Sequence, residues 1–178
     1  MSSLEIVLIA GSPSRSSRSA TLLGRLAAAA QARGFTTTTI EVRDLPAAEL
    51  LAAARDFPPL KAALETCERA RGIVLATPVY KATYTGLLKC FLDIFPDGAL
   101  RGKSAFPIAT AGSPGHQLSV DTGLKPVLSV MGCSRIAAGF FATDAEFEPG
   151  AGGAPALKPE AQARFDAAVA DFLTVCAA

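Results

Sequence analysis

The chain has 178 residues, of which 50% are hydrophobic and 19% are charged, and its 17 basic residues nearly balance 16 acidic ones. This length and apolar content suit one domain with a substantial buried core and exclude a largely disordered chain. A formal net charge of +1 argues against a nucleic-acid binder that relies on long-range attraction to phosphate. We therefore expect a single domain over residues 1–178.

The sequence also argues against a membrane anchor, a secretory signal and a metal site. The start MSSLEIVLIAGSP lacks a basic leader, and no apolar run approaches the roughly 20 residues that a membrane span needs. One histidine, His116, and four widely spaced cysteines are a poor ligand set for zinc. We expect a cytoplasmic protein that binds no metal, no nucleic acid and no membrane.

Short apolar or β-branched runs alternate with segments of helical periodicity along the chain. Five runs, each ending near a turn residue, predict strands: 4–10, 35–42, 71–78, 104–111 and 134–142. Apolar residues at helical spacing predict helices that begin after the serine-rich stretch and continue over 47–70, 84–95, 120–132 and 158–176. We expect the helix over 47–70 to break at Pro58 and Pro59 and the helix over 120–132 to be interrupted near Gly123 and Pro126. Residues 146–159 predict a surface loop rich in glycine and proline.

The alternation of five strands with helices predicts a parallel sheet covered on both faces, with right-handed crossovers. In such sheets, ligands bind outside the carboxyl ends of the strands. If the strand order is 2-1-3-4-5, strands 1, 3 and 4 are neighbours. The loops over 10–19, 77–86 and 110–118 then meet in one place.

The loop after the first predicted strand, AGSPSRSSRSATLL over residues 10–23, holds five serines and two arginines and has no acid. Backbone N–H groups at a helix N-terminus favour phosphate, and serine and arginine side chains add donors. The loop has neither the P-loop lysine nor a G-x-G-x-x-G pattern. We favour a phosphate site. The alternatives are a helix cap by Ser17 or Ser19 with solvated neighbours and, less favoured, a regulatory phosphorylation site.

The two other loops predict a site for a flat ligand. TPVYKATYTG, over 77–86, places an aliphatic residue, an aromatic residue and a lysine where a heteroaromatic ring could stack. The alternative is that Tyr80 packs on the following helix. TAGSPGHQ, over 110–117, lets a ligand approach the backbone closely. A catalytic triad of Ser113, His116 and Asp121 lacks the G-x-S-x-G elbow, and we do not favour it.

With these stretches the sequence resembles the flavodoxin-like NAD(P)H-dependent FMN reductases, and most closely those of two-component alkanesulfonate monooxygenase systems. The resemblance covers about residues 5–144 and is most specific in TPVYKATYTGLLK and LKPVL. It implies an α/β, flavodoxin-like three-layer sandwich, with a five-stranded parallel sheet of order 2-1-3-4-5 and helices on both faces.

The resemblance also implies a site and a reaction. The residues implied to hold the FMN phosphate are Ser12, Ser17, Arg18 and Ser19. Those implied to border the isoalloxazine ring are Pro78, Val79, Tyr80 and Lys81, with Gly112 and Ser113 on its far side. The implied reaction is hydride transfer from NADPH or NADH to FMN, and no catalytic acid or base is assigned. In the family the reduced flavin passes to an FMNH2-dependent monooxygenase, and homodimers and homotetramers are usual.

Thr122 departs from the pattern of these reductases. The relatives have a tyrosine here, in a one-residue helical bulge at the subunit interface that is linked to the use of flavin as a substrate. Threonine cannot stack across an interface as tyrosine does, which favours the first of two alternatives that stay open. One is a flavoprotein that keeps FMN tightly bound and reduces quinones, azo compounds or metal oxyanions. The other is a non-enzymatic flavodoxin-like electron carrier, against which the near-neutral charge counts.

Overall fold

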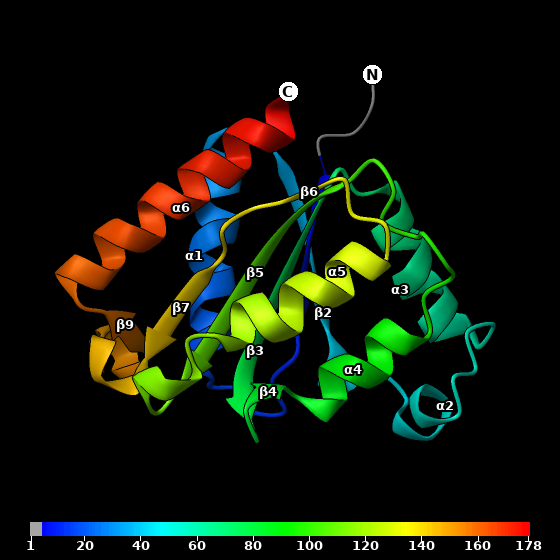
Figure 1. Ribbon diagram of the computed structural model, residues 1–178, viewed down its shortest axis with the longest axis horizontal. Coiled ribbons are helices and arrows are strands. Elements are labelled where there is room, and N and C mark those ends of the chain that lie inside the picture. The colour runs from blue at the N-terminus through cyan, green and yellow to red at the C-terminus, as the bar shows by residue number, and fades with distance from the viewer. Residues whose placement is uncertain (1–4) are drawn as a thin grey trace.

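The computed structural model describes residues 5–178 and has a mostly parallel sheet at its centre (Figure 1). The strands are β1 (Glu5–Ala10), β2 (Thr36–Glu41), β3 (Gly72–Tyr80), β4 (Thr83–Tyr84), β5 (Ser104–Ala111), β6 (Arg135–Ile136) and β7 (Phe140–Thr143). They lie in the order β2-β1-β3-β5-β6, while β7 also pairs with β5, and β4 folds back on the end of β3. The predicted order 2-1-3-4-5 is confirmed, with β6 and β7 sharing the fifth position. The predicted first strand began at Leu4, which lies outside the described residues.

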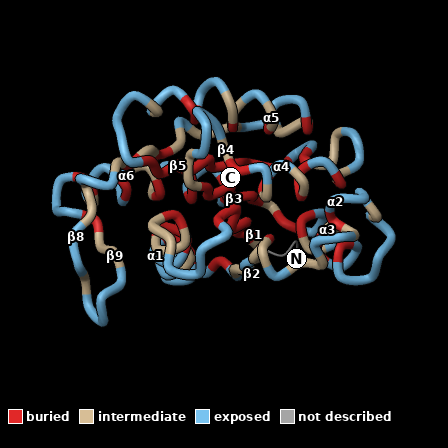
Figure 2. Tube along the Cα trace, turned by 90° about the horizontal axis from the view of Figure 1, so that it is seen from below, coloured by how far each residue is buried: buried red, intermediate tan, exposed pale blue. Residues whose placement is uncertain are grey.

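Helices cover both faces of the sheet, and successive strand residues point to opposite faces. The helices are α1 (Arg18–Ala32), α2 (Ala47–Leu51), α3 (Pro58–Arg69), α4 (Gly86–Asp93), α5 (Lys125–Val130) and α6 (Pro159–Ala177). Ile6 and Leu8 pack with residues of α1 and α6 in one core, while Val7 and Ile9 pack with residues of α2 to α5 in the other. The central strands are therefore buried between two helical layers (Figure 2).

No helix among residues 5–178 is both long enough and apolar enough to cross a membrane.

The fifth predicted strand is split because Pro107 and Gly139 interrupt its pairing. β6 pairs Ile136 with Ala105, whereas β7 pairs Phe140 with Ile108, so the chain inserts one extra residue between them. Pro107 has no N–H to donate to a ladder. Gly139 has a φ of 86°, and a Cβ there would lie 2.8 Å from the Pro107 carbonyl oxygen. The interruption is thus a bulge that needs glycine.

Two other predictions need correction. The helix break lies before the prolines, because α2 ends at Leu51 and Pro58 and Pro59 are the first residues of α3, where a missing N–H is tolerated. The surface loop predicted over 146–159 contains an antiparallel pair, β8 (Phe147–Pro149) and β9 (Pro155–Leu157). A segment so rich in glycine and proline shows no strand pattern in the sequence. Leu157, at the end of β9, is buried against the core formed with α1 and α6.

The burial of the cysteines predicts which thiols react in the folded protein. Burial raises the pKa of Cys67 to about 12 and that of Cys176 to about 11, whereas Cys90 and Cys133 are half-buried. Because the thiolate is the reactive form and burial also raises the pKa of Cys133, a disulfide reagent at pH 8 should modify Cys90 first and Cys133 more slowly. Cys67 and Cys176 should react on addition of denaturant, measured by the release of chromophore and by mass spectrometry. Rapid reaction of all four thiols without denaturant would contradict this packing.

Candidate functional site

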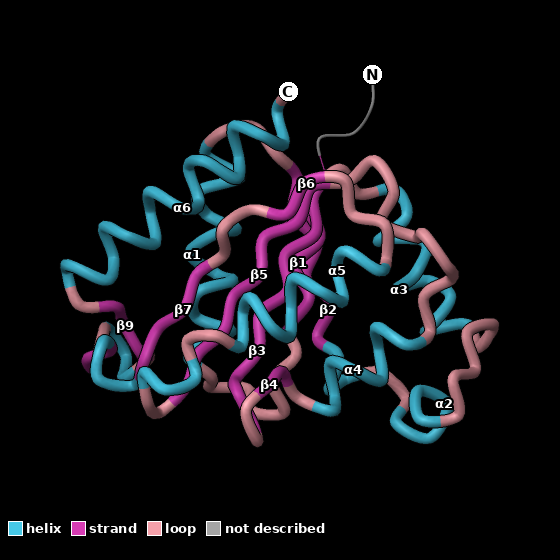
Figure 3. Tube along the Cα trace, viewed as in Figure 1, coloured by secondary structure: helices cyan, strands magenta, loops and turns pink. Residues whose placement is uncertain are grey.

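The carboxyl ends of β1, β3 and β5 lie at the lower edge of the molecule in Figure 1, and residues at and after these ends line a cavity of about 370 Å³. The residues that line it come from the serine-rich loop and the start of α1, from the ends of β3 and β5, from the turn after β7 and from the hairpin before α6: Ser12, Ser14, Ser16, Ser17, Arg18, Pro78, Val79, Tyr80, Thr110, Ala111, Gly112, Asp144 and Pro155. Figure 3 shows these strands ending in loops on the same side of the sheet. The predicted meeting of the three loops is therefore correct.

The serine-rich loop leads directly into the N-terminus of α1. Ser17 is the N-cap, and its Oγ accepts a hydrogen bond from the Ala20 N–H at 3.1 Å. Ser12 is buried, and its Oγ accepts from the Ser14 N–H at 3.2 Å. The first turn of α1 contains no acid, so the partial positive charge of this helix end is not neutralised from within the helix.

Arg18 adds a cation to the same end of the cavity. Its Nη1 lies 3.2 Å from Oδ1 of Asp144, and its guanidinium carbon lies 5.7 Å from the centre of the Phe147 ring. The Nε atom is buried and has no hydrogen-bond partner among the described residues. Arg18 is thus placed by an acid and an aromatic ring from the opposite side of the cavity, and it retains an unused donor.

The other wall is formed by the end of β3 and a tight hairpin. Lys81 and Ala82, which join β3 to β4, have φ angles of 51° and 75°, a conformation that glycine or asparagine usually supplies. Thr85 then begins α4 and donates a hydrogen bond to the Gly11 carbonyl at 2.6 Å. Its own N–H donates to Oγ1 of Thr77 at 3.1 Å. These buried hydrogen bonds fasten the hairpin to the serine-rich loop.

The interrupted helix over 120–132 contains a π-helical turn, η3 (Val120–Leu124), in front of α5. The Lys125 N–H donates to the Val120 carbonyl, five residues earlier. Pro126 explains the widening, because it cannot donate and its ring would clash with the carbonyl four residues back in a regular helix. The Thr122 hydroxyl donates to the Leu118 carbonyl at 2.9 Å. A π-helical turn therefore forms in this chain with threonine at position 122.

η3 also touches the hairpin at the cavity. A Cβ on Gly123 would lie 2.6 Å from Oγ1 of Thr83 and 3.4 Å from the Tyr84 ring. Only glycine permits this approach without displacement of the hairpin. The π-helical turn therefore packs directly against the hairpin that follows the cavity wall.

The structure places most of the predicted site residues together. Those that line the cavity are Ser12, Ser17, Arg18, Pro78, Val79, Tyr80 and Gly112. Three others do not line it. Ser19 is buried with its Oγ 3.2 Å from that of Ser17, Lys81 is exposed at the hairpin tip, and the Ser113 Oγ accepts from the Gly115 N–H at 3.2 Å. Their roles toward FMN stay predictions.

The triad that we did not favour has different partners here. Ser113 caps a short helical turn over Pro114–His116, while Asp121 is paired with Lys125, four residues later in the chain. His116 contacts Ser113 through its backbone N–H, which donates to the Ser113 carbonyl at 3.3 Å. These contacts give Ser113 no activating base.

Sequence reasoning missed Asp144, Thr85 and Arg43. Thr85 has a local signal, since a threonine before Gly86 and an apolar helical run is a typical N-cap. Asp144 and Arg43 carry no such signal. Asp144 follows β7, and Arg43 belongs to a helical turn after β2, η1 (Val42–Asp44), so only the fold brings them to the serine-rich loop.

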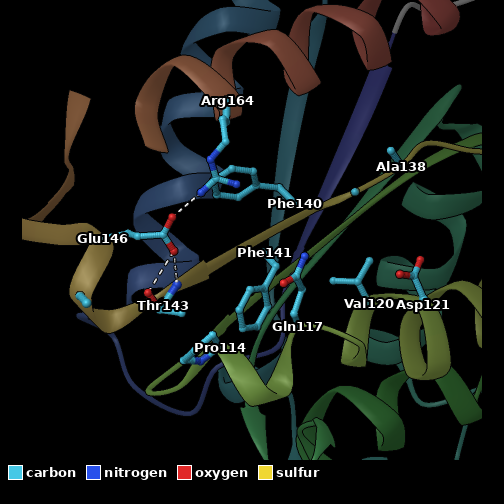
Figure 4. Close-up of a pocket in the computed structure, with 12 residues that line it drawn as sticks. Pro114, Gln117, Val120, Asp121, Ala138, Phe140, Phe141, Thr143, Glu146 and Arg164 are labelled. Atoms are coloured by element: carbon cyan, nitrogen blue, oxygen red, sulfur yellow. Dashed lines mark hydrogen bonds and ion pairs between the residues drawn. The ribbon is translucent and has the colours of Figure 1, made fainter. Parts of the chain in front are cut away.

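A second cavity, of about 570 Å³, lies beside the first and is lined in part by Gln117, Phe141, Glu146 and Arg164 (Figure 4). Oε2 of Glu146 accepts from the N–H and the hydroxyl of Thr143 at 2.7 and 3.0 Å. Burial acts to raise the pKa of Glu146, but these hydrogen bonds and the Arg164 ion pair lower it below its usual value. The ionised Glu146 thereby closes a capping box around the turn that carries Asp144.

Arg43 holds the outer side of the serine-rich loop. Its Nη1 donates to the Ser14 carbonyl at 3.2 Å and approaches the Ser12 carbonyl at 3.5 Å. The side chain is only 12% exposed and is paired with Glu41 at 2.9 Å. Arg43 therefore supplies a charged donor to two carbonyls of the serine-rich loop.

We predict that Arg43→Ala weakens binding of FMN by about five- to tenfold, because loop carbonyls lose a charged donor. The FMN affinity of Arg43→Lys should lie between that of Arg43→Ala and that of the wild type, since lysine keeps the charge but lacks the planar set of guanidinium N–H donors. Arg15→Ala is the matched control: Arg15 bonds Asp44 from the same loop at 2.7 Å, but its side chain is 76% exposed, so its loss should change little. Fluorescence titration measures the affinities, and wild-type affinity in Arg43→Ala would contradict this role.

The donors of the first cavity fit a phosphate monoester. Serine hydroxyls, the unneutralised N-terminus of a 15-residue helix and the side chain of Arg18 lie at one end, which is the chemistry that binds a dianion. The wall of Pro78, Val79 and Tyr80 offers the other end a flat, partly apolar surface. The cavity therefore suits a phosphorylated ligand with a planar ring.

Comparison with known proteins gives consistent matches. The profile of a family described as NADPH-dependent FMN reductase matches residues 4–148. An FMN reductase (NADPH) of Pseudomonas putida KT2440 is 44% identical over 151 residues, which cover 85% of this chain and 77% of that protein. An FMN reductase (NADPH) of Escherichia coli K12 is 37% identical over 169 residues, covering 95% and 88%. The apo crystal structure of an NADH:FMN oxidoreductase (EMOB) superposes with a TM-score of 0.88 at 40% identity, covering 96% of this chain and 89% of that one.

Proposed function

Because the chain belongs to the NADPH-dependent FMN reductase family, we propose that it transfers a hydride from NADPH or NADH to FMN at the cavity between β1, β3 and β5. The observation that carries this proposal is the placement of phosphate donors and a flat wall in one cavity. The relatives include an FMN reductase (NADPH) and an NADH:FMN oxidoreductase, so we propose either coenzyme as the hydride donor.

The chain's own residues bind and orient the flavin in this proposal. Ser12, Ser17 and Arg18 take the phosphate, with the N-terminus of α1 behind them. Pro78, Val79 and Tyr80 border the ring, with Gly112 opposite. Lys81, Ser19 and Ser113 do not line the cavity, so in this proposal they act on FMN from the margin of the cavity or through the residues that line it. Flavin itself supplies the hydride acceptor, so the protein needs only to align the two rings and to stabilise negative charge with backbone N–H groups.

We propose further that FMN is a substrate that leaves after reduction and feeds an FMNH2-dependent monooxygenase. The π-helical turn over Val120–Leu124 supports this version, because the resemblance links a helical bulge at this place to the use of flavin as a substrate. The runner-up enzyme keeps FMN bound and reduces quinones, azo compounds or metal oxyanions. Retention of one yellow flavin per chain through purification would favour the runner-up.

Steady-state assays separate these versions. The purified protein should oxidise NADPH or NADH, followed at 340 nm, only when FMN is added, because a released flavin must be replaced in each cycle. Coenzyme oxidation that is independent of added FMN would contradict the substrate version. A protein that binds FMN but lets neither coenzyme bleach it would instead be an electron carrier.

We predict that Arg18→Ala weakens FMN binding by about 1.5–3 kcal/mol, or about 10- to 150-fold, because a charged hydrogen bond to the phosphate is lost. Riboflavin, which has no phosphate, should bind the variant as it binds the wild type. Arg25→Ala, an exposed arginine on the same helix, is the matched control for net charge. Equal FMN affinity in Arg18→Ala and wild type would reject this phosphate site.

We also propose that the protein forms a homodimer or a homotetramer in the cytoplasm. Leu118 and Val130 flank η3 and are 66% and 85% exposed, and a groove of about 560 Å³ runs between α4 and α5 beside Val130. Large exposed apolar side chains next to a groove are typical of an interface between subunits. Light scattering measures the assembly, and a monomer would contradict it.

A further inference from the structure

Asp144 is an acid in a cavity whose other polar groups suit an anion. It lines the same cavity as Ser12, Ser17 and Arg18, and its Oδ2 is the nearest neighbour, at 3.9 Å, of a Cβ built on Gly112. Its side chain is 46% exposed, and Arg18 is 41% exposed. A carboxylate here repels a phosphate and occupies the cation that the phosphate needs.

The position of Asp144 is fixed by its neighbours in the chain. It begins η4 (Asp144–Glu146), a turn closed by the capping box between Thr143 and Glu146. Arg164 on α6 pairs with Glu146 from outside, as Figure 4 shows. The turn that carries Asp144 is therefore held by a hydrogen-bonded network rather than left to move with the loop.

Arg18 does not depend on Asp144 alone for its placement. Its guanidinium lies over the Phe147 ring, and its Nε is buried without a partner among the described residues. An arginine placed by packing stays in the cavity when its acid is neutralised. Removal of the charge of Asp144 should therefore free Arg18 for a ligand without displacing it.

We propose that Asp144 sets the affinity of the site for phosphorylated flavin by competing with the phosphate for Arg18. This inference rests on the proposed function, since it concerns the same cavity. In the free protein the Asp144 carboxylate is the counter-ion of Arg18. When FMN enters, its phosphate displaces that carboxylate, and on release the ion pair re-forms. Asp144 is thus a specificity-determining residue that lowers the advantage of FMN over flavins without a phosphate and favours release.

The test is the affinity of Asp144→Asn for FMN and for riboflavin, measured by quenching of flavin fluorescence. The variant keeps the shape of the side chain and removes its charge. FMN should bind about three- to fivefold more tightly than to wild type, as expected for the loss of a half-exposed charge pair. Riboflavin affinity should be unchanged, and added salt should reduce the gain. Asp171→Asn, an exposed acid near the end of α6, is the control for net charge and should match wild type.

Combining Asp144→Asn with Arg18→Ala tests whether Asp144 acts on FMN affinity through Arg18. Competition for Arg18 predicts that Asp144→Asn then gives a smaller gain, because only the direct repulsion of the phosphate is relieved, whereas an equal or larger gain in this background would overturn the proposal. Unchanged or weaker FMN binding in Asp144→Asn would overturn it too. Riboflavin binding reports whether each variant is folded, and Asp144→Ser provides a second neutral side chain.

Failure of this inference and failure of the proposed function give different results. If wild type binds FMN and riboflavin equally, and Arg18→Ala binds FMN as wild type does, the phosphate site itself is wrong. If wild type prefers FMN but Asp144→Asn does not strengthen that preference, only the competition is wrong.

Discussion

The site depends on the parallel pairing of β1, β3 and β5, which ends all three strands at one edge of the sheet. Each strand is buried on both faces, so a slip in register would place charged or polar loop residues in a core. The hydrogen bonds from Thr85 to Gly11 and Thr77 extend this pairing into the loops. The positions of the phosphate donors and of the flat wall both follow from it.

Around that frame, the serine-rich loop is held from two sides by charged groups. Arg43 binds its carbonyls from η1, and Asp144 binds Arg18 from η4. The first contact orders the donors, and the second opposes the ligand that they attract. An enzyme that must bind FMN and then release it needs both effects. Contacts that stabilise the complex equally before and after reduction would slow release of the flavin.

The sequence is informative where local chemistry decides the structure. Buried apolar runs predict the strands, the family resemblance implies their order, and a serine-rich turn between strand and helix predicts the phosphate site. The split of the last strand escapes such reasoning, because it requires Pro107 and Gly139, which are 32 residues apart in the chain, to be neighbours. Arg43 and Asp144 escape it for the same reason. The β8–β9 hairpin was missed because glycine and proline hide its short strands.

Thr122 shows the limit of reasoning from one substitution. The helical turn widens because Pro126 removes a donor and Gly123 admits the hairpin, so its form does not require an aromatic residue at 122. The central claim remains the place of the flavin phosphate, and a crystal structure of the FMN complex tests it most directly. Our account predicts the phosphate at the N-terminus of α1, bound to Arg18, with Asp144 displaced from that guanidinium. A phosphate located elsewhere, with the Arg18–Asp144 pair intact, would contradict it.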